Sequence, residues 1–101
     1  MKGDTFKIGD LVTYDDHNYF GTSAIIWRVA KLKTFRSFYM LWLAPAFCIT
    51  GYEIPLKNKR MSGDNVKKLD IVQVGLLHQR FVDFIKASFV PVDDVKPDAE
   101  V

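Results

Sequence analysis

The longest uncharged segment of the chain runs from Phe38 to Ile49 and reads FYMLWLAPAFCI. Its twelve residues, interrupted by Pro45, are too few to cross a bilayer, which takes about 20 apolar residues. Large apolar side chains occupy odd and even positions alike, so a strand formed here is apolar on both faces. One face suits a core. The other face must meet a C-terminal helix or another protein molecule.

Length and composition indicate a single domain. A chain of 101 residues, 49% hydrophobic and 26% charged, can bury one core without disulfides or metals. An aromatic content of 14% favours strands over helices. Cys48 is the one cysteine, which argues against a disulfide framework, and the N-terminal residues lack the apolar segment of a signal peptide. We therefore expect a cytoplasmic protein without a membrane anchor.

Apolar residues at period two predict strands in the first two thirds of the chain. The first strand should bend at Gly9-Asp10, and a change of face after Val29 predicts a bulge near Ala30-Lys31. Pro45 cannot donate to a ladder, so it should separate two strands. Polar, turn-forming residues predict loops at 15–23 and 57–65. The predicted strands are residues 6–14, 24–33, 38–44, 46–54 and 66–74.

The pattern changes to helical spacing near the C-terminal end. Leu77, Phe81, Phe84 and Ile85 recur at intervals of three and four residues, which predicts an amphipathic helix over residues 76–88, preceded by a strand that ends at Gly75. We expect one globular domain over residues 1–90. Residues 91–101 are acidic and contain no apolar repeat, which predicts a flexible tail.

These elements predict a mainly β (α+β) fold: an SH3-like small barrel, or a strongly curved antiparallel sheet, of about five strands with one C-terminal helix. The strings FKIGDLVTY and WRVAKL, within residues 6–33, resemble the opening strands of SH3-like barrels of the KOW and Tudor type. They are also similar to the start of short phage and mobile-element proteins. The resemblance implies a binding module for nucleic acid, methylated residues or proline-rich peptides.

The residues that carry catalytic chemistry are sparse. Cys48 lies between Phe47 and Ile49, so burial should raise the pKa of its thiol and leave it inert. Consecutive Asp15, Asp16 and His17 fit a solvated loop better than a metal site. His78 is expected on the polar side of the helix, and no glycine-rich phosphate loop is present. We expect a protein that is not an enzyme, with no catalytic residues, no metal and no cofactor.

Positive charge is concentrated in the middle of the chain. Residues 28–68 carry a net charge of +7 (nine basic residues, two acidic), between segments of −2 (residues 1–27) and −3 (residues 69–101). These side chains could line a nucleic-acid-binding rim beside aromatic residues, or they could protect a sheet edge from pairing with other chains. The nine basic candidates are Arg28, Lys31, Lys33, Arg36, Lys57, Lys59, Arg60, Lys67 and Lys68.

The preferred functional hypothesis is a non-catalytic protein-binding or adaptor module. It would engage a protein partner, or a second copy of itself, through the aromatic strand and adjoining loops. The alternative hypothesis is a small barrel that binds nucleic acid through the basic rim. The candidates for the protein interface are Tyr19, Phe20, Tyr39, Leu41, Trp42 and Leu43.

Overall fold

The computed structural model describes residues 5–14, 18–19, 22–86 and 88–92. Strands dominate this part of the chain, and one long helix follows them. The elements are β1 (Leu11–Thr13), β2 (Asn18–Tyr19), β3 (Thr22–Ser23), β4 (Ile25–Thr34), β5 (Tyr39–Ile49), β6 (Lys59–Ser62), the 3-10 turn η1 (Gly63–Asn65), β7 (Lys67–Leu69), α1 (Ile71–Ile85) and β8 (Phe89–Pro91).

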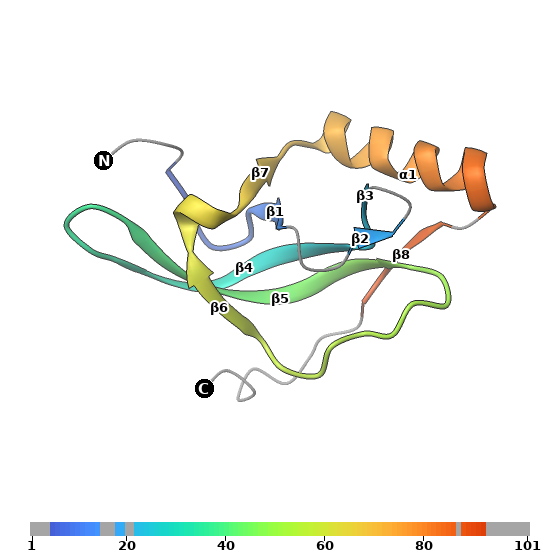
Figure 1. The fold of residues 1–101 in the computed structure, drawn as a ribbon. Helices are drawn as coiled ribbons and strands as arrows, with labels where there is room; N and C mark the ends of the chain where they lie inside the picture. The colour runs from blue at the N-terminus through green and yellow to red at the C-terminus, as the bar shows by residue number, and fades with distance from the viewer. Residues whose placement is uncertain (1–4, 15–17, 20–21, 87, 93–101) are drawn as a thin grey trace.

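Six of the strands form one antiparallel sheet in the order β6-β5-β4-β1-β7, and β8 pairs with the far end of β5. The long β4–β5 hairpin forms the floor of the molecule, and β1, β7 and α1 lie above it (Figure 1). The end strands β6 and β7 do not pair with each other, so among the described residues the sheet stays open. The predicted mainly β class with a C-terminal helix is confirmed.

The predicted bend and bulge are both present. Gly9 adopts φ 95°, where a side chain would be strained, and the backbone turns there before β1 begins. The pairing of β4 with β5 shifts register between Val29 and Lys31, which leaves Ala30 as the extra residue of a bulge. The first strand is shorter than the predicted 6–14, and Ile8, an apolar residue of that predicted strand, is 61% exposed.

The prediction that Pro45 separates two strands is wrong. β5 continues through Pro45, which lies opposite Trp27 at a second register shift of the β4–β5 ladder. On the other side of β5, β6 pairs with residues 40–43 and β8 with residues 47–49, so neither paired stretch includes Pro45. The missing N–H therefore falls where the ladders are already interrupted. The predicted strand 46–54 ends early, at Ile49.

The boundary between the last predicted strand and the helix is also wrong. β7 ends at Leu69 and α1 begins at Ile71, so Gly75 lies inside the helix. The cause is a capping box: the Asp70 carboxylate accepts from the Gln73 backbone N–H at 2.9 Å, and the Gln73 side chain accepts from the Asp70 N–H at 2.9 Å. The helix ends at Ile85, before the predicted residue 88.

Three further boundaries differ from the predictions. The predicted loop 57–65 contains β6 and η1, since this polar segment pairs with the apolar strand β5. The predicted loop 15–23 contains the small β2–β3 hairpin. β8 extends to Pro91, so the first residue of the predicted tail belongs to the sheet, and residues 93–101 lie outside the described part.

The core lies between the β4–β5 hairpin and the elements above it. Phe6 packs edge-on against Tyr39 at 5.7 Å between ring centroids, and Phe81 of α1 packs edge-on against Phe89 at 5.4 Å. The helix therefore covers the core through Phe81, at the β8 end of the sheet. The buried cluster consists of Phe6, Val12, Ala24, Ile25, Ile26, Trp27, Val29, Leu41, Leu43, Cys48, Ile49, Phe81 and Phe89.

Candidate functional site

The candidate site is the outer face of strands β4, β5 and β6. Residues directly opposite each other in an antiparallel ladder project from the same face, so the register assigns each side chain to a face. Leu41 and Leu43 face the core and are fully buried. Met40, Trp42 and Ala44 alternate with them and face outward. The register places Arg28 opposite Ala44, Lys31 opposite Trp42 and Lys33 opposite Met40.

Trp42 is the centre of this outer face. Lys31 lies opposite it on β4 and Arg60 lies opposite it on β6, so one row across three strands reads Lys31, Trp42, Arg60. The Lys31 ammonium lies 4.7 Å from the centroid of the Trp42 ring. Trp42 is only 9% exposed, and its indole Nε1 is buried without a hydrogen-bond partner in the described part of the chain. A buried donor without a partner is unusual.

The tip of the β4–β5 hairpin extends this surface. Phe35 and Phe38 stack at 4.9 Å between centroids and 15° between planes, and the Lys33 ammonium lies 5.8 Å from the Phe35 ring. Phe35 is 42% exposed, and Arg36 beside it is exposed. Figure 1 shows this hairpin projecting from the body of the molecule. The tip thus presents an aromatic face between two cations.

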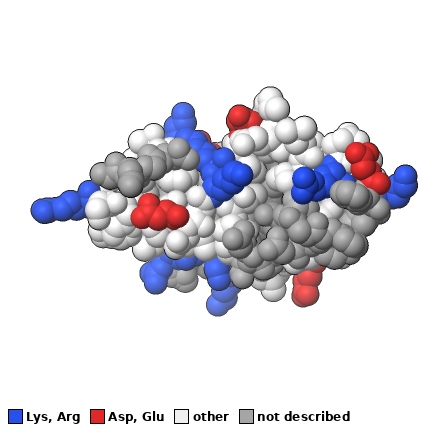
Figure 2. Space-filling view, turned by 45° about the horizontal axis from the view of Figure 1, so that its top comes forward, with Lys and Arg blue, Asp and Glu red and all other residues white. Residues whose placement is uncertain are grey.

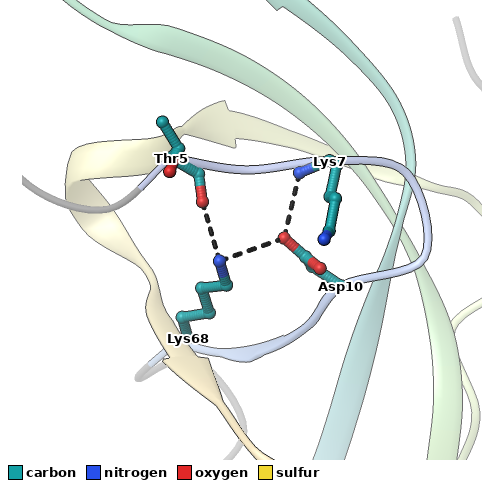
Figure 3. A network of polar contacts seen from close by, with 4 residues as sticks. All are labelled: Thr5, Lys7, Asp10 and Lys68. Atoms are coloured by element: carbon teal, nitrogen blue, oxygen red, sulfur yellow. Dashed lines mark hydrogen bonds and ion pairs between the residues drawn. The ribbon is translucent and has the colours of Figure 1, made fainter.

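Lys68 is held within the fold and does not join the outer face. Its ammonium donates to the Thr5 carbonyl oxygen at 2.8 Å and lies 3.4 Å from Asp10 Oδ2, which also accepts the Lys7 backbone N–H at 2.9 Å (Figure 3). The Asp10 side chain is only 13% exposed. This network fastens β7 to the bend before β1, so Lys68 has a structural role.

The nine predicted basic residues therefore do not share one rim. Lys67 lies on β7, at the opposite end of the sheet order from β6. Lys57 and Lys59 border a groove described below. The space-filling view shows Lys and Arg in separate groups, with uncharged surface and acidic groups between them (Figure 2). The cations that belong to the outer face and its tip are Arg28, Lys31, Lys33, Arg36 and Arg60.

The predicted protein-interface residues do not lie together on one surface of the described structure. Leu41 and Leu43 are buried in the chain's own core, and Tyr39 is half-buried against Phe6. Trp42 lies beneath Lys31 on the outer face. The backbone of Tyr19 belongs to β2, but its side chain and all of Phe20 lie outside the described residues.

A second surface is a groove of about 870 Å³ beside the end of β5. Its wall combines Trp27 of β4 and Tyr14, which follows β1, with the loop that leads from β5 to β6, and the Tyr14 and Trp27 rings lie 5.5 Å apart. Leu56, at 83% exposure, is the most exposed apolar residue of the wall. The lining residues are Tyr14, Trp27, Tyr52, Glu53, Ile54, Pro55, Leu56, Lys57, Asn58 and Lys59.

Cys48 is 1% exposed, as predicted, and burial raises the pKa of its thiol above the ordinary value. Its Sγ donates to the Tyr52 carbonyl oxygen at 3.7 Å. His78, expected at the surface, is half-buried with its ring edge-on to Phe89 at 6.2 Å. Asp15, Asp16 and His17 lie outside the described residues. Among the residues that are described, no three His, Cys, Asp or Glu side chains gather as metal ligands do.

Two exposed apolar features were not predicted from the sequence. Phe35 lies between the predicted strands 24–33 and 38–44, and an aromatic residue beside Arg36 in such a connection is the available signal. On the first turns of α1, Ile71, Val72 and Leu76 are 64–78% exposed. The predicted strand 66–74 includes Ile71 and Val72, and Leu76 is the first residue of the predicted helix; the string Asp70-x-x-Gln73 before an apolar segment is the signal for the earlier helix start.

Comparison of the chain with protein-family models, with curated proteins and with solved structures finds no match. In the described part of the chain, no helix reaches the length and hydropathy needed to cross a membrane.

Proposed function

We propose that this protein is a non-catalytic module that binds single-stranded nucleic acid through the outer face of β4–β6 and the β4–β5 tip. The observation that carries the proposal is the row Lys31, Trp42, Arg60, continued by Lys33 toward the stacked Phe35–Phe38 pair. Proteins that bind single strands combine cations that follow the phosphates with aromatic faces on which bases stack.

The charge and exposure of the outer face and the hairpin tip support them as the binding surface, in preference to the apolar side chains of β5. Lys31, Lys33, Arg36 and Arg60 are exposed, and in the described part of the chain none of them is paired with a carboxylate. The stacking surface in this proposal is Phe35, because Trp42 is covered by Lys31. The aromatic residue that this proposal uses for stacking is therefore the exposed Phe35 at the hairpin tip.

The test is fluorescence anisotropy of a labelled oligothymidylate at several salt concentrations. If about four cations contact phosphates, log K should fall with log salt at a slope of about −3. The double variant Lys31→Glu/Arg60→Glu should lose most of the binding. The matched control is Lys67→Glu/Arg80→Glu, which alters exposed residues of β7 and α1 and lowers the net charge by the same four units, from +2 to −2.

The proposal is abandoned if the wild-type protein shows no salt-sensitive binding at low ionic strength. It is also abandoned if both double variants weaken binding equally, because general charge would then account for the affinity without a site. Circular dichroism of both variants would confirm that each retains the β-rich fold.

The groove favours a second candidate function, a module that binds another protein. Because Leu41 and Leu43 are buried in the core, we propose the groove, in place of the aromatic strand, as the protein-binding surface. The support is the combination of Tyr14, Trp27 and Tyr52 with the apolar residues Ile54 and Leu56 in one wall. Aromatic and apolar walls with a few polar groups suit extended peptide ligands.

Leu56→Ser is the discriminating variant, because this side chain is 83% exposed and its loss should leave the fold intact. If the groove binds peptides, Leu56→Ser should weaken the capture of clones from a displayed peptide library while oligothymidylate affinity stays unchanged. Failure of the wild-type protein to enrich any peptide would remove this candidate.

We also keep the SH3-like assignment as a proposal. The bend at Gly9 and the bulge at Ala30 support it, since both devices roll a small sheet. A solution structure with β6 and β7 far apart would contradict it. The cytoplasmic location stays a prediction from the sequence.

A further inference from the structure

We infer that the groove beside the end of β5 selects extended peptides that carry a carboxylate next to an apolar side chain. This inference rests on the second candidate function, since it names the chemistry of the peptide that the groove would bind. Three properties of the groove lead to it: an aromatic floor, a loop whose backbone groups are free to pair, and positive charge at one end.

The floor of the groove is aromatic and suits an apolar side chain of a ligand. Trp27, which lines the groove, is 1% exposed, and the half-buried Tyr14 lies 5.5 Å from it between ring centroids. Leu56, on the loop that forms the wall, is 83% exposed. A ligand side chain placed against Tyr14 and Leu56 would remove apolar surface of both molecules from water, which favours binding.

The loop from β5 to β6 presents its backbone along the groove. The Tyr52 carbonyl oxygen accepts from Cys48 Sγ at 3.7 Å, and Lys59 pairs with Leu43, so both ends of the loop are fixed to β5. Between them, residues 53–57 line the groove and make no hydrogen bond within the described part of the chain. The main chain of an extended peptide supplies both donors and acceptors for such backbone groups.

Positive charge lies at the β6 end of the groove. Lys57 and Lys59 both line it and are exposed, and within the described residues neither is paired with a carboxylate. With Glu53, the lining as described carries a net charge of +1. Two neighbouring exposed cations attract a ligand carboxylate and repel a basic peptide.

The position of Glu53 determines which end takes the carboxylate. Glu53 follows Tyr52, whose carbonyl contacts Cys48, whereas Lys59 is paired with Leu43. Five residues of β5 lie between these two levels, which corresponds to roughly 16 Å at about 3.3 Å per residue. Salt at physiological concentration screens exposed charges beyond about 8 Å. A ligand carboxylate beside Lys59 is therefore little affected by Glu53, whereas one beside Glu53 would be repelled.

The experiment selects clones from the displayed peptide library and measures fluorescence anisotropy of a labelled synthetic peptide from an enriched clone. Enriched clones should carry aspartate or glutamate near an apolar residue more often than the unselected library does. Replacing the carboxylates of the peptide by amides should weaken binding about threefold to tenfold, as expected for one or two exposed ion pairs.

The protein variant Lys57→Glu/Lys59→Glu should weaken binding of the acidic peptide about tenfold or more, because attraction becomes repulsion. The matched control is again Lys67→Glu/Arg80→Glu, which lowers the net charge equally, from +2 to −2, and should change the affinity by less than about twofold. A peptide with lysine in place of its acidic residues should bind Lys57→Glu/Lys59→Glu more tightly than the wild type, a gain that a misfolded variant could not show.

Three results would overturn the inference. Equal losses in the two double variants would show that general charge sets the affinity. A fall in oligothymidylate affinity of Lys57→Glu/Lys59→Glu as large as that of Lys31→Glu/Arg60→Glu would assign these lysines to nucleic acid. Enrichment of uncharged peptides that Leu56→Ser no longer captures would leave the groove as a peptide site without acidic specificity, whereas no enrichment at all would remove both the second candidate function and this inference.

Discussion

The two faces of the β4–β5 hairpin are built from adjacent residues of the same strands, yet they are covered differently. On the inner face, Leu43 and Val29 lie opposite each other and are fully buried beneath β1 and its neighbours. On the outer face one residue away, Trp42 is covered by the ammonium of Lys31. Apolar side chains alone therefore do not mark a core-facing position.

The two sides of the apolar strand β5 therefore lie beside different kinds of residue: Val29 is opposite Leu43 on the inner face, and Lys31 and Arg60 are opposite Trp42 on the outer face. The Lys31 ammonium lies 4.7 Å from the centroid of the Trp42 ring, and long basic side chains can place their aliphatic stems along apolar surface while the charged heads stay in water. Such a face keeps its charge available to an anion. The stability contributed by the inner face depends on the volume of its buried side chains, whereas the proposed binding by the outer face depends on its charge.

Truncation of the inner face should have the largest effect on stability. Leu43→Ala removes a fully buried side chain and should lower the free energy of unfolding by about 2–5 kcal/mol. Lys31→Ala on the outer face loses a partly solvated cation–π contact and should cost about 1 kcal/mol or less. Urea unfolding followed by circular dichroism measures both values. Equal decreases in the free energy of unfolding for the two variants would show that the inner and outer faces contribute equally to stability.

Two glycines sharpen the comparison between buried and exposed positions. A Cβ at Gly63 would lie 2.8 Å from Phe6 Cε2, in a packed region, so Gly63→Ala should destabilise by about 1–3 kcal/mol. A Cβ at Gly75, exposed within α1, meets nothing within 4 Å, so Gly75→Ala should stabilise by about 0.5–1 kcal/mol. Thermal unfolding would report the opposite signs, and a stable Gly63→Ala would show that Phe6 yields easily.

The smallest effect on stability is expected at the hairpin tip. Phe35→Ser removes a side chain that is 42% exposed and stacked on Phe38, so the free energy of unfolding should change by about 1 kcal/mol or less. Oligothymidylate affinity should fall about tenfold, because one stacked base contributes about 1–3 kcal/mol. Thr34→Ser, a small change on the same tip, serves as the control. Unchanged affinity of Phe35→Ser would confine nucleic-acid contacts to the cations.

Features that depend on neighbours in sequence were predicted well. The bend at Gly9 and the bulge at Ala30 follow from a glycine beside an aspartate and from a change in apolar period, and both are present. The helix around Phe81 was also predicted, because three- and four-residue spacing is a local signal. Its predicted start, residue 76, is too late because residues 71–74 belong to the predicted strand 66–74, whereas the capping box at Asp70 starts the helix at Ile71.

Pairing partners could not be predicted in the same way. Pro45 remains inside β5 because the ladders on both sides of it are interrupted there, and residues 59–62 form a strand because β5 offers them a free edge. Likewise, the nine basic residues look alike in sequence, but register places Lys31 and Arg60 on either side of Trp42 and leaves Lys68 bound to Asp10.

The sequence by itself determined a single β-rich core around an apolar strand, with positive charge on both sides of it and acidic residues at the end. Those properties follow from side-chain period and composition, which any fold must satisfy. Only the tertiary structure decided which cations share a face with Trp42 and which of them, such as Lys68, is bound within the fold. Strand register brings residues distant in sequence into contact, and a one-residue change of register would exchange the two faces.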